Sequence, residues 1–428
     1  MRFPNCRLQF AFIAAVLPMM AVAGRVSAQE WRAWRGPTLD NHAPAEADKV
    51  VPTTWSETQN VLWKSAIPGK GHATPIVVGD GVFVLTHEPN ERTISLLKYS
   101  VSDGKPTGKV VLHRGVEPPS YLHKKNTCAS GTPSSDGRLI YVAAQVGDAI
   151  YASAVSVQGQ IVWQRVVAPY RAGKGWFGYG SSPLLLDDAV VIPVDTDNRD
   201  AGLFALNKVN GMPKWRGERP LSTSYSSPIL ATIAGRPQVL ISGGYRVASY
   251  DPRSGGLNWK VNATSRTTCA TMVWNENMAF ASGSYPDSGT FGIAVTAQGG
   301  RLVWENRIKC YEQSMLVVGD YLYGIADSGV AYCWRCADGE EMWRSRLSGP
   351  FSASPMLVGD RIYASNERGT TYVFRASPDG FESLAENKLG DSSFASPIYA
   401  DQKLILRHAS SESGQREEFL VAIGAAPN

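Results

Sequence analysis

The sequence predicts an all-β fold, an eight-bladed β-propeller of four-stranded antiparallel blades. Residues 314–343 contain four short apolar or alternating segments, separated by turns at 319–320, 327–329 and 337–339. Alternation of apolar and polar residues between such turns is typical of antiparallel strands with one buried face. Because a single sheet of this kind cannot bury both faces, it needs copies of itself on either side.

Eight copies of this unit follow one another along the chain. Each begins with a small residue, then Pro or Met, then a short apolar run, and successive starts lie 40 to 58 residues apart. The starts are Thr74-Pro75, Thr132-Pro133, Ser182-Pro183, Ser227-Pro228, Thr271-Met272, Ser314-Met315, Ser354-Pro355 and Ser396-Pro397. A Gly four residues before a Trp closes most units, at Gly159/Trp163, Gly211/Trp215, Gly255/Trp259, Gly300/Trp304 and Gly339/Trp343. A repeat of this length with four strands per unit indicates propeller blades.

Residues 1–28 are expected to be a secretory signal peptide. Arg2 and Arg7 precede an almost wholly apolar run at 10–23, and Val26-Ser27-Ala28 offers a small-x-small cleavage site. The alternative is an uncleaved membrane anchor, but the run is shorter than the roughly 20 residues that a span needs. We therefore expect an exported protein, periplasmic or secreted, that is monomeric and has no transmembrane span after signal removal.

The charge balance argues against a nucleic-acid partner. The chain carries a formal net charge of +4, and the leader holds three of its arginines and no acidic residue, which leaves +1 for the mature chain. A general nucleic-acid binder should keep a clear excess of Lys and Arg. About 400 mature residues exceed the roughly 250–300 that one globular core accommodates. A propeller avoids this limit because each sheet packs only on its neighbours, so residues 59–428 are expected to form one domain.

The two ends of the chain are expected to share a blade. Residues 29–58 are predicted to be a lead-in segment that lies across the outside of the blades, with Trp31 and Trp34 facing them. Residues 60–64 match the last strand of a blade although no blade precedes them. The eighth unit has three strands and no closing Trp. We expect the strand of Trp63 to complete blade eight and to close the ring by hydrogen bonds, which removes exposed edges.

The repeats resemble the pyrroloquinoline-quinone (PQQ) type propeller family. The resemblance rests on the Gly-x-x-x-Trp repeats and on the opening, Trp34-Arg35-Gly36-Pro37, Val61-Leu62-Trp63-Lys64 and Gly71-His72-Ala73-Thr74-Pro75. It covers the chain from Trp31 to the C-terminus. It implies one of two branches: quinoprotein dehydrogenases, or non-enzymatic propellers that include an envelope lipoprotein assisting outer-membrane barrel assembly. The repeat is informative about fold and weak about function, because function lies in sites grafted on folds.

The resemblance to the dehydrogenase branch implies a cofactor cradle that the sequence does not match. That branch leads one to look for two adjacent cysteines over the quinone and for Glu, Asn and Asp ligands of a Ca²⁺ ion. The cysteines stand at 6, 128, 269, 310, 333 and 336, with no adjacent pair. We therefore expect a non-catalytic binding or scaffold protein of the cell envelope without a cofactor. The alternative is a PQQ- and Ca²⁺-dependent alcohol or sugar dehydrogenase.

Two further motifs have structural interpretations. Cys333 and Cys336 lie three apart on a strand, so they are about 10 Å apart on opposite faces, beyond the roughly 7 Å that a disulfide spans. We expect two buried small apolar residues, and an odd number of five mature cysteines leaves at least one free or paired between chains. Residues 195–200 place oxygen side chains at alternate positions, as a Ca²⁺ loop does, but they lack the Gly and distal Glu of an EF-hand. A polar turn between strands is the favoured interpretation.

The loops before the innermost strands are the candidate site, because in a propeller they meet at one mouth of the central channel. They hold bases and aromatic residues, so they are either ordinary solvated loops or a binding rim for an anionic or extended partner, a protein or an envelope polymer. Trp176 is expected to be the main anchor. The candidate rim residues are Lys70, His72, His123, Lys124, Lys125, Lys174, Trp176, Phe177, Tyr179, Tyr225, Arg266, Lys309 and Tyr311.

Overall fold

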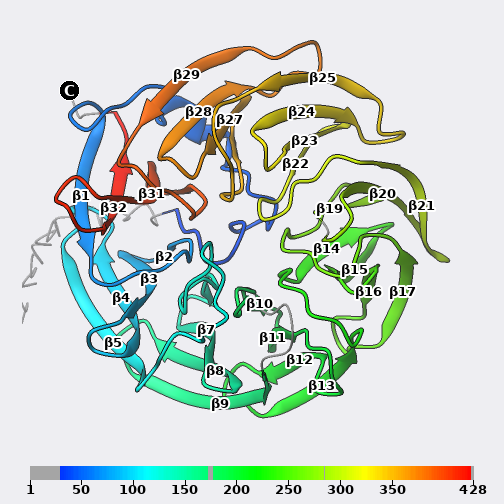
Figure 1. Ribbon diagram of the computed structural model, residues 1–428, viewed down its shortest axis with the longest axis horizontal. Helices are drawn as coiled ribbons and strands as arrows, with labels where there is room; N and C mark the ends of the chain where they lie inside the picture. Colours follow the sequence, from blue (N-terminus) through cyan, green and yellow to red (C-terminus); the bar gives the residue numbers. More distant parts are fainter. Residues whose placement is uncertain (1–28, 172–176, 284, 426–428) are drawn as a thin grey trace, which may run out of the picture.

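Eight antiparallel sheets of four strands stand around a central axis in the computed structural model, which describes residues 29–171, 177–283 and 285–425 (Figure 1). This arrangement confirms the predicted all-β propeller. Within the described residues the helical element is one short 3-10 turn, η1 (Ala45–Lys49). No helix in that part of the chain has the length and apolar character needed to cross a bilayer. The signal peptide expected at 1–28 lies outside the described residues.

The first four blades follow one another from the N-terminal side. Blade one contains β2 (Ile76–Val78), β3 (Gly81–Glu88), β4 (Thr93–Ser100) and β5 (Pro106–Arg114). Blade two contains β6 (Ser134–Ser135), β7 (Leu139–Val146), β8 (Ala149–Ser156) and β9 (Ile161–Pro169). Blade three contains β10 (Leu184–Leu185), β11 (Ala189–Val194), β12 (Gly202–Asn207) and β13 (Pro213–Glu218). Blade four contains β14 (Ile229–Ile233), β15 (Arg236–Ser242), β16 (Arg246–Tyr250) and β17 (Leu257–Asn262).

The remaining blades complete the ring. Blade five contains β18 (Val273–Trp274), β19 (Met278–Gly283), β20 (Gly289–Thr296) and β21 (Gly299–Asn306). Blade six contains β22 (Leu316–Val318), β23 (Tyr321–Ile325), β24 (Val330–Arg335) and β25 (Glu341–Arg346). Blade seven contains β26 (Met356–Val358), β27 (Arg361–Ser365), β28 (Thr370–Arg375) and β29 (Ser383–Lys388). Blade eight contains β30 (Ile398–Ala400), β31 (Lys403–Ser410), β32 (Glu417–Ile423) and β1 (Val61–Ile67).

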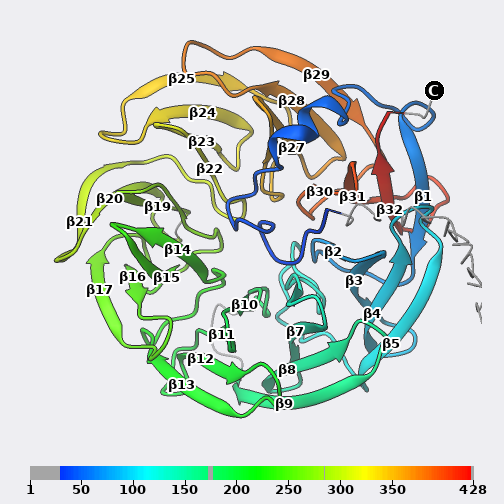
Figure 2. The same ribbon diagram turned by 180° about the vertical axis from the view of Figure 1, so that it is seen from behind.

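The position of β1 confirms the predicted ring closure. It pairs antiparallel with β32, with Trp63 opposite Ala422 and Ile67 opposite Glu418. β1 and β32 lie side by side at the outer edge of the ring in both views (Figures 1 and 2). The chain therefore closes the propeller with one strand from each end of the fold.

The Gly-x-x-x-Trp spacing has a packing explanation. The indole of Trp163 donates to the Lys208 carbonyl of the next blade at 3.0 Å, and Gly211 of that blade lies against the ring. A Cβ on Gly211 would sit 2.7 Å from the Trp163 ring, and its φ of +72° is a conformation that glycine adopts readily. Gly104 meets the ring of Trp63 in the same way. Gly255, Gly300 and Gly339 meet Trp215, Trp259 and Trp304 in the same way, so five of the eight blades supply a Gly that receives the Trp of the blade before.

The small residue that opens each unit is a hydrogen-bonding residue. Its hydroxyl accepts from the backbone N–H of the equivalent residue in the preceding blade at seven of the eight junctions between described blades, at 2.9–3.1 Å. At the eighth junction the hydroxyl of Thr271 instead accepts from the indole of Trp34 at 2.9 Å. We call these residues the hydroxyl ring: Thr74, Thr132, Ser182, Ser227, Thr271, Ser314, Ser354 and Ser396. The ring joins all eight innermost strands around the channel.

The lead-in lies across one end of the channel, so its predicted course over the outside of the blades is wrong. Trp31 is 1% exposed and pairs through two backbone hydrogen bonds with Val77 in β2. The backbone then passes Ser135 and reaches Leu357 in β26. Figure 2 shows this segment in front of the centre of the ring. The innermost strands have one unpaired edge each, and the lead-in supplies partners for backbone groups of β2, β6 and β26.

His408 in β31 makes the folding stability depend on pH. It is 4% exposed, and no described residue bonds to either ring nitrogen. Burial, and secondarily Lys64, lowers the pKa of His408 to about 4 from an ordinary 6.5. The unfolded chain therefore binds the proton first as pH falls. This part of the stability is complete above pH 6.5 and is lost as pH falls towards 4.

We expect His408→Phe to reduce the acid sensitivity of folding. The wild type should lose about 2 kcal/mol more unfolding free energy than the variant between pH 7 and pH 5, because only the wild type gains this proton on unfolding. Urea unfolding at the two pH values measures the difference. Equal losses in both proteins would contradict the assignment.

Candidate functional site

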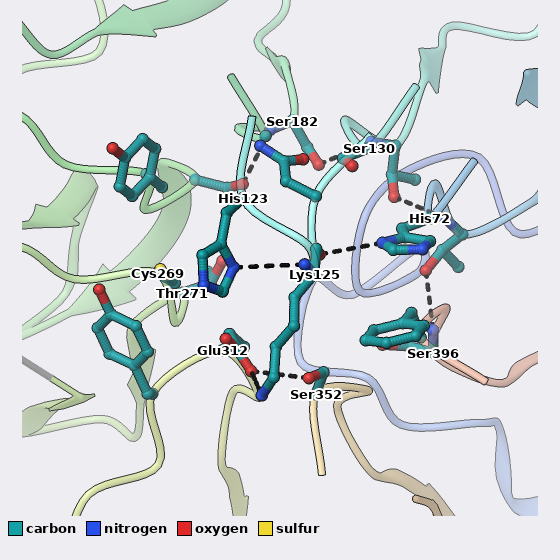
Figure 3. A pocket seen from close by; sticks show the side chains of 18 of the residues that line it. His72, His123, Lys125, Ser130, Ser182, Cys269, Thr271, Glu312, Ser352 and Ser396 are labelled. Carbon is teal, nitrogen blue, oxygen red and sulfur yellow. Dashed lines mark hydrogen bonds and ion pairs between the residues drawn. The ribbon is translucent and has the colours of Figure 1, made fainter. Parts of the chain in front are cut away.

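The loops that precede the innermost strands surround a cavity of about 370 Å³ at one mouth of the channel (Figure 3). Trp34 of the lead-in is among the residues lining this cavity, and its indole is fixed to Thr271 of the hydroxyl ring. The lead-in itself pairs with the strands β2 and β26 further along the channel. The cavity is therefore a funnel that opens at the loops and has Trp34 and the lead-in at its inner end.

The wall of the funnel repeats with the blades. The residue two positions before each member of the hydroxyl ring lines the cavity, because alternate residues of an extended chain point to the same side. We call these eight residues the wall ring: His72, Ser130, Gly180, Tyr225, Cys269, Glu312, Ser352 and Phe394. The hydroxyl ring is nearly uniform in chemistry, whereas the wall ring differs at almost every blade. The wall ring is therefore where this chain sets the character of its funnel.

The structure places the predicted rim residues in three groups. Six line the cavity, namely His72, His123, Lys125, Phe177, Tyr225 and Tyr311. Four lie on the rim outside the cavity lining, namely Lys70, Lys124, Arg266 and Lys309. Lys174 and Trp176, the expected anchor, lie outside the described residues.

Tyr179 was misplaced by the sequence analysis. It is 7% exposed and packs edge-on against Tyr170 with 5.8 Å between ring centroids, and its hydroxyl donates to the Pro193 carbonyl at 3.2 Å. It stands one residue before the wall-ring position Gly180, so its side chain points away from the channel into the packing between blades. Tyr179 is a core residue and is not available to a partner.

Lys125 spans the funnel. It comes from the long connection between blades one and two, and its ammonium group contacts Glu312 at 2.9 Å and Glu367 at 2.7 Å on the opposite side. Burial lowers its pKa and the contacts with Glu367 and Glu312 raise it, with a net increase that keeps the amine charged. Ser352 donates to the same Glu312 oxygen at 2.7 Å. Figure 3 shows the side chain extended across the cavity, with His72 on one side and Cys269 on the other.

Backbone contacts hold Lys125 in this position. His72 Nδ1 donates to the Lys125 carbonyl at 3.1 Å, and the Lys125 N–H donates to His123 Nδ1 at 3.3 Å. The His72 ring stacks on Phe394 with centroids 4.2 Å apart. Lys125 is thus tied to blade one near its backbone and to blades six and seven at its amine.

The positive charge of the rim is largely matched by carboxylates. Arg266 pairs with Asp197 at 2.9 Å and Lys309 with Asp327 at 3.5 Å. Among the described residues none forms an ion pair with Lys70 or Lys124, and both side chains are exposed. Any long-range attraction of an anionic partner would come from these two lysines.

Aromatic side chains line the funnel mouth on the side of blades three to six. Phe177 is 37% exposed and Tyr285 is 57% exposed, so both present ring surface to solvent. His123 meets the Phe177 ring edge-on at 5.2 Å, and the Phe177 N–H donates to the Tyr225 hydroxyl at 3.0 Å. Phe177 is therefore held in place by neighbours although it stands at the surface.

Burial favours the neutral form of four groups that line the funnel, namely His72, Tyr225, Tyr311 and Cys269. Burial, and secondarily Arg407, lowers the pKa of His72 to about 3. Burial also raises the pKa of Tyr225, Tyr311 and Cys269 well above the ordinary range. The Cys269 thiol therefore stays protonated and is a poor nucleophile.

The remaining motifs of the sequence are structural. The five cysteines of the described chain are free, and Cys333 and Cys336 are both buried. Asp195, in the turn between β11 and β12, forms a buried two-point ion pair at 2.8 Å and 2.6 Å with Arg219, which follows β13. No group of three or more His, Cys, Asp or Glu within the described residues has the arrangement of a metal site.

Eight residues that line the cavity and belong to the site were not among the predicted rim residues: Trp34, Ser130, Gly180, Cys269, Tyr285, Glu312, Ser352 and Phe394. Six of them belong to the wall ring, so the repeat register contained the signal that finds those six. Trp34 gave no such signal, because the lead-in has no repeat. Glu367 also contacts Lys125, but it comes from the turn between β27 and β28 and has no counterpart in the register.

The fold and the funnel define a PQQ-like β-propeller. The chain belongs to the family described as outer membrane protein assembly factor BamB, whose model matches residues 105–345 and 289–411. No curated protein matches the sequence.

Several solved structures share the fold. BamB from Moraxella catarrhalis is 13% identical with a TM-score of 0.59, and the match covers 85% of this chain and 99% of that one. A europium-containing methanol dehydrogenase is 10% identical with a TM-score of 0.63, over 92% of this chain and 98% of that one. Quinohemoprotein alcohol dehydrogenase from Comamonas testosteroni is 11% identical with a TM-score of 0.62, over 94% and 81%. At these identities the likeness establishes the fold alone.

Proposed function

We propose that the protein is an exported propeller of the cell envelope that binds a partner at the funnel and does not catalyse a reaction. The observation that carries the proposal is that the Lys125 amine, which lies inside the cavity, is already paired with the carboxylates of Glu312 and Glu367. The cavity is thereby a fixed, braced surface with protonated tyrosines and a protonated thiol. Membership of a family described as an outer membrane assembly factor supports a place in the envelope. So does the signal peptide expected at residues 1–28.

The residues of the funnel do not fit PQQ, the cofactor of the alternative function. PQQ is a planar quinone with three carboxylates, so its site must supply several cations. Among the described residues lining the cavity, Lys125 is the one permanently charged cation, and two carboxylates already accept from it. An anionic quinone would meet a net negative cluster, which opposes its binding.

Capture from an envelope extract tests the binding role. We expect the wild type to retain a partner, and the rim variant Lys124→Glu/Tyr245→Ala to lose most of it, because both residues are exposed at the loop end of the propeller. Met212→Ala is the matched control, since Met212 is 55% exposed in the turn between β12 and β13 at the opposite end. A partner lost with Met212→Ala and kept by the rim variant would place the binding surface elsewhere.

A dye-linked dehydrogenase assay tests the alternative. We expect no turnover of alcohols or aldoses after incubation of the protein with PQQ and Ca²⁺, because the cluster around Lys125 repels the quinone carboxylates. Turnover well above a no-protein control would overturn the non-catalytic proposal.

A further inference from the structure

The open half of the funnel combines apolar ring faces with fixed hydrogen-bonding groups. Lys125 occupies the middle of the cavity, and Cys269 and Thr271 lie beyond it on the side of the exposed aromatic residues (Figure 3). Phe177, Tyr285 and Tyr311 supply ring surface there. A cavity of about 370 Å³ is at the lower end of the roughly 300–1,000 Å³ range of small-ligand sites, so it accommodates a compact ligand.

The hydrogen-bonding groups are already oriented. Glu312 Oε2 accepts from both Lys125 and Ser352, and no described residue donates to Glu312 Oε1. Lys125 therefore fixes the carboxylate and leaves one oxygen for a ligand. The Tyr225 hydroxyl accepts from the Phe177 N–H, which leaves its own proton to donate. An acceptor and a donor thus stand beside the aromatic faces without needing to reorganise on binding.

The charge of the cluster selects among ligands. Lys125 and the two carboxylates sum to a net negative charge, so an anionic ligand is repelled. The Lys125 ammonium group already pairs with both carboxylates. A cationic ligand would have to compete with Lys125 for these carboxylates. A neutral ligand that has many hydroxyl groups and an apolar face can donate a hydrogen bond to Glu312 and pack its apolar face against the aromatic rings.

We propose that the funnel binds a neutral saccharide, with a sugar ring against the aromatic residues and its hydroxyls on Glu312 and Tyr225. The proposal rests on the binding function proposed above and names its ligand class. Trp34 lines the cavity, and the lead-in crosses the inner end of the channel between β2 and β26, so the ligand enters from the rim (Figure 2). The ligand is therefore a glycan end or a free small saccharide.

Isothermal titration of the full protein with cellobiose, maltose and N,N′-diacetylchitobiose tests the proposal. We expect saturable binding of at least one of them, weakened about tenfold or more by Phe177→Ala and by Glu312→Gln, since each removes one contact of a small ligand. Met212→Ala is the matched control, because Met212 is 55% exposed in the turn between β12 and β13, at the end of the propeller opposite the cavity. It should leave the affinity unchanged. Circular dichroism melts establish that the variants are folded.

The comparison ligands are galacturonate, an anionic sugar, and glucosamine, a cationic one. Binding of either charged sugar with no binding of the three neutral probes would overturn the proposal. So would the absence of saturable binding by the wild type, or equal affinities in Phe177→Ala, Glu312→Gln and the wild type. If the neutral probes fail while the rim-dependent partner is still captured from the extract, the saccharide inference fails and the binding function stands. If both fail, the binding function fails as well.

Discussion

Replacing residues 60–64 by a Gly/Ser linker of equal length is expected to lower the unfolding free energy by about 5 kcal/mol. The replacement removes Trp63, which is 8% exposed, and truncation of a buried Trp alone costs about 3–5 kcal/mol. It also weakens the pairing of β1 with β32, because three of the six paired positions lie in the replaced segment and Gly and Ser hold an extended strand less well. The edge of blade eight is then open more often. The lead-in stays attached, so the loss reports on closure of the ring. Urea unfolding followed by far-ultraviolet circular dichroism measures it.

The same linker in place of residues 411–415 is the control for this replacement. That segment is the exposed turn between β31 and β32, so its replacement should change the unfolding free energy by less than about 1 kcal/mol. The unprotected edge of β32 should also make the first variant form dimers, which size-exclusion chromatography detects. Equal stability of the two variants would show that β1 contributes little to closure.

The ring and its closure were predictable from the sequence because they depend on repetition. The small residue that opens each unit recurs since its hydroxyl bonds to the blade before it, and the Gly recurs since it receives a Trp ring. Residues 60–64 stood out because they matched a strand that had no blade of its own. The lead-in had no pattern to be compared with. Its course depends on unpaired edges of the innermost strands, which exist only once the ring has formed.

The funnel was predictable in position and only partly in composition. The repeat register brought the correct loops together, but residues were then chosen by chemical type. Tyr179 is the instructive error, because it lies one position away from the wall ring and so points into the core. Glu312 lies beside Tyr311 at the wall-ring position of the same loop, but a single acidic residue does not stand out among the bases and aromatic residues of the rim. The pairing of Lys125 with Glu367 joins a loop before blade two to a turn of blade seven, and Glu367 does not stand at a repeat position, so no pattern in the sequence indicates it.

A buried ion pair also stabilises the junction of blades eight and one, in addition to the pairing of β1 with β32. Arg407 in β31 and Glu418 in β32 are each 2% exposed at the side chain and form an ion pair at 2.7 Å. Arg407 also donates to the carbonyls of Ala73 and Leu85 in blade one, at 3.1 Å and 2.9 Å. Glu418 accepts from the Gly71 N–H at 3.2 Å. The pair therefore binds the backbone of the first blade from the last one.

Glu418→Ala is expected to lower the unfolding free energy by about 3–5 kcal/mol, because it leaves the Arg407 guanidinium buried without its counter-charge. Glu417→Ala is the matched control. Glu417 is the neighbouring residue on the same strand but is exposed, and its loss should cost less than about 1 kcal/mol. Urea unfolding of both variants at neutral pH gives the comparison. Because the charges of a buried pair are little screened, the loss in Glu418→Ala should persist in 0.5 M NaCl. A loss that matches that of Glu417→Ala, or that disappears in salt, would show that the pair is reached by solvent and does not hold the two blades together.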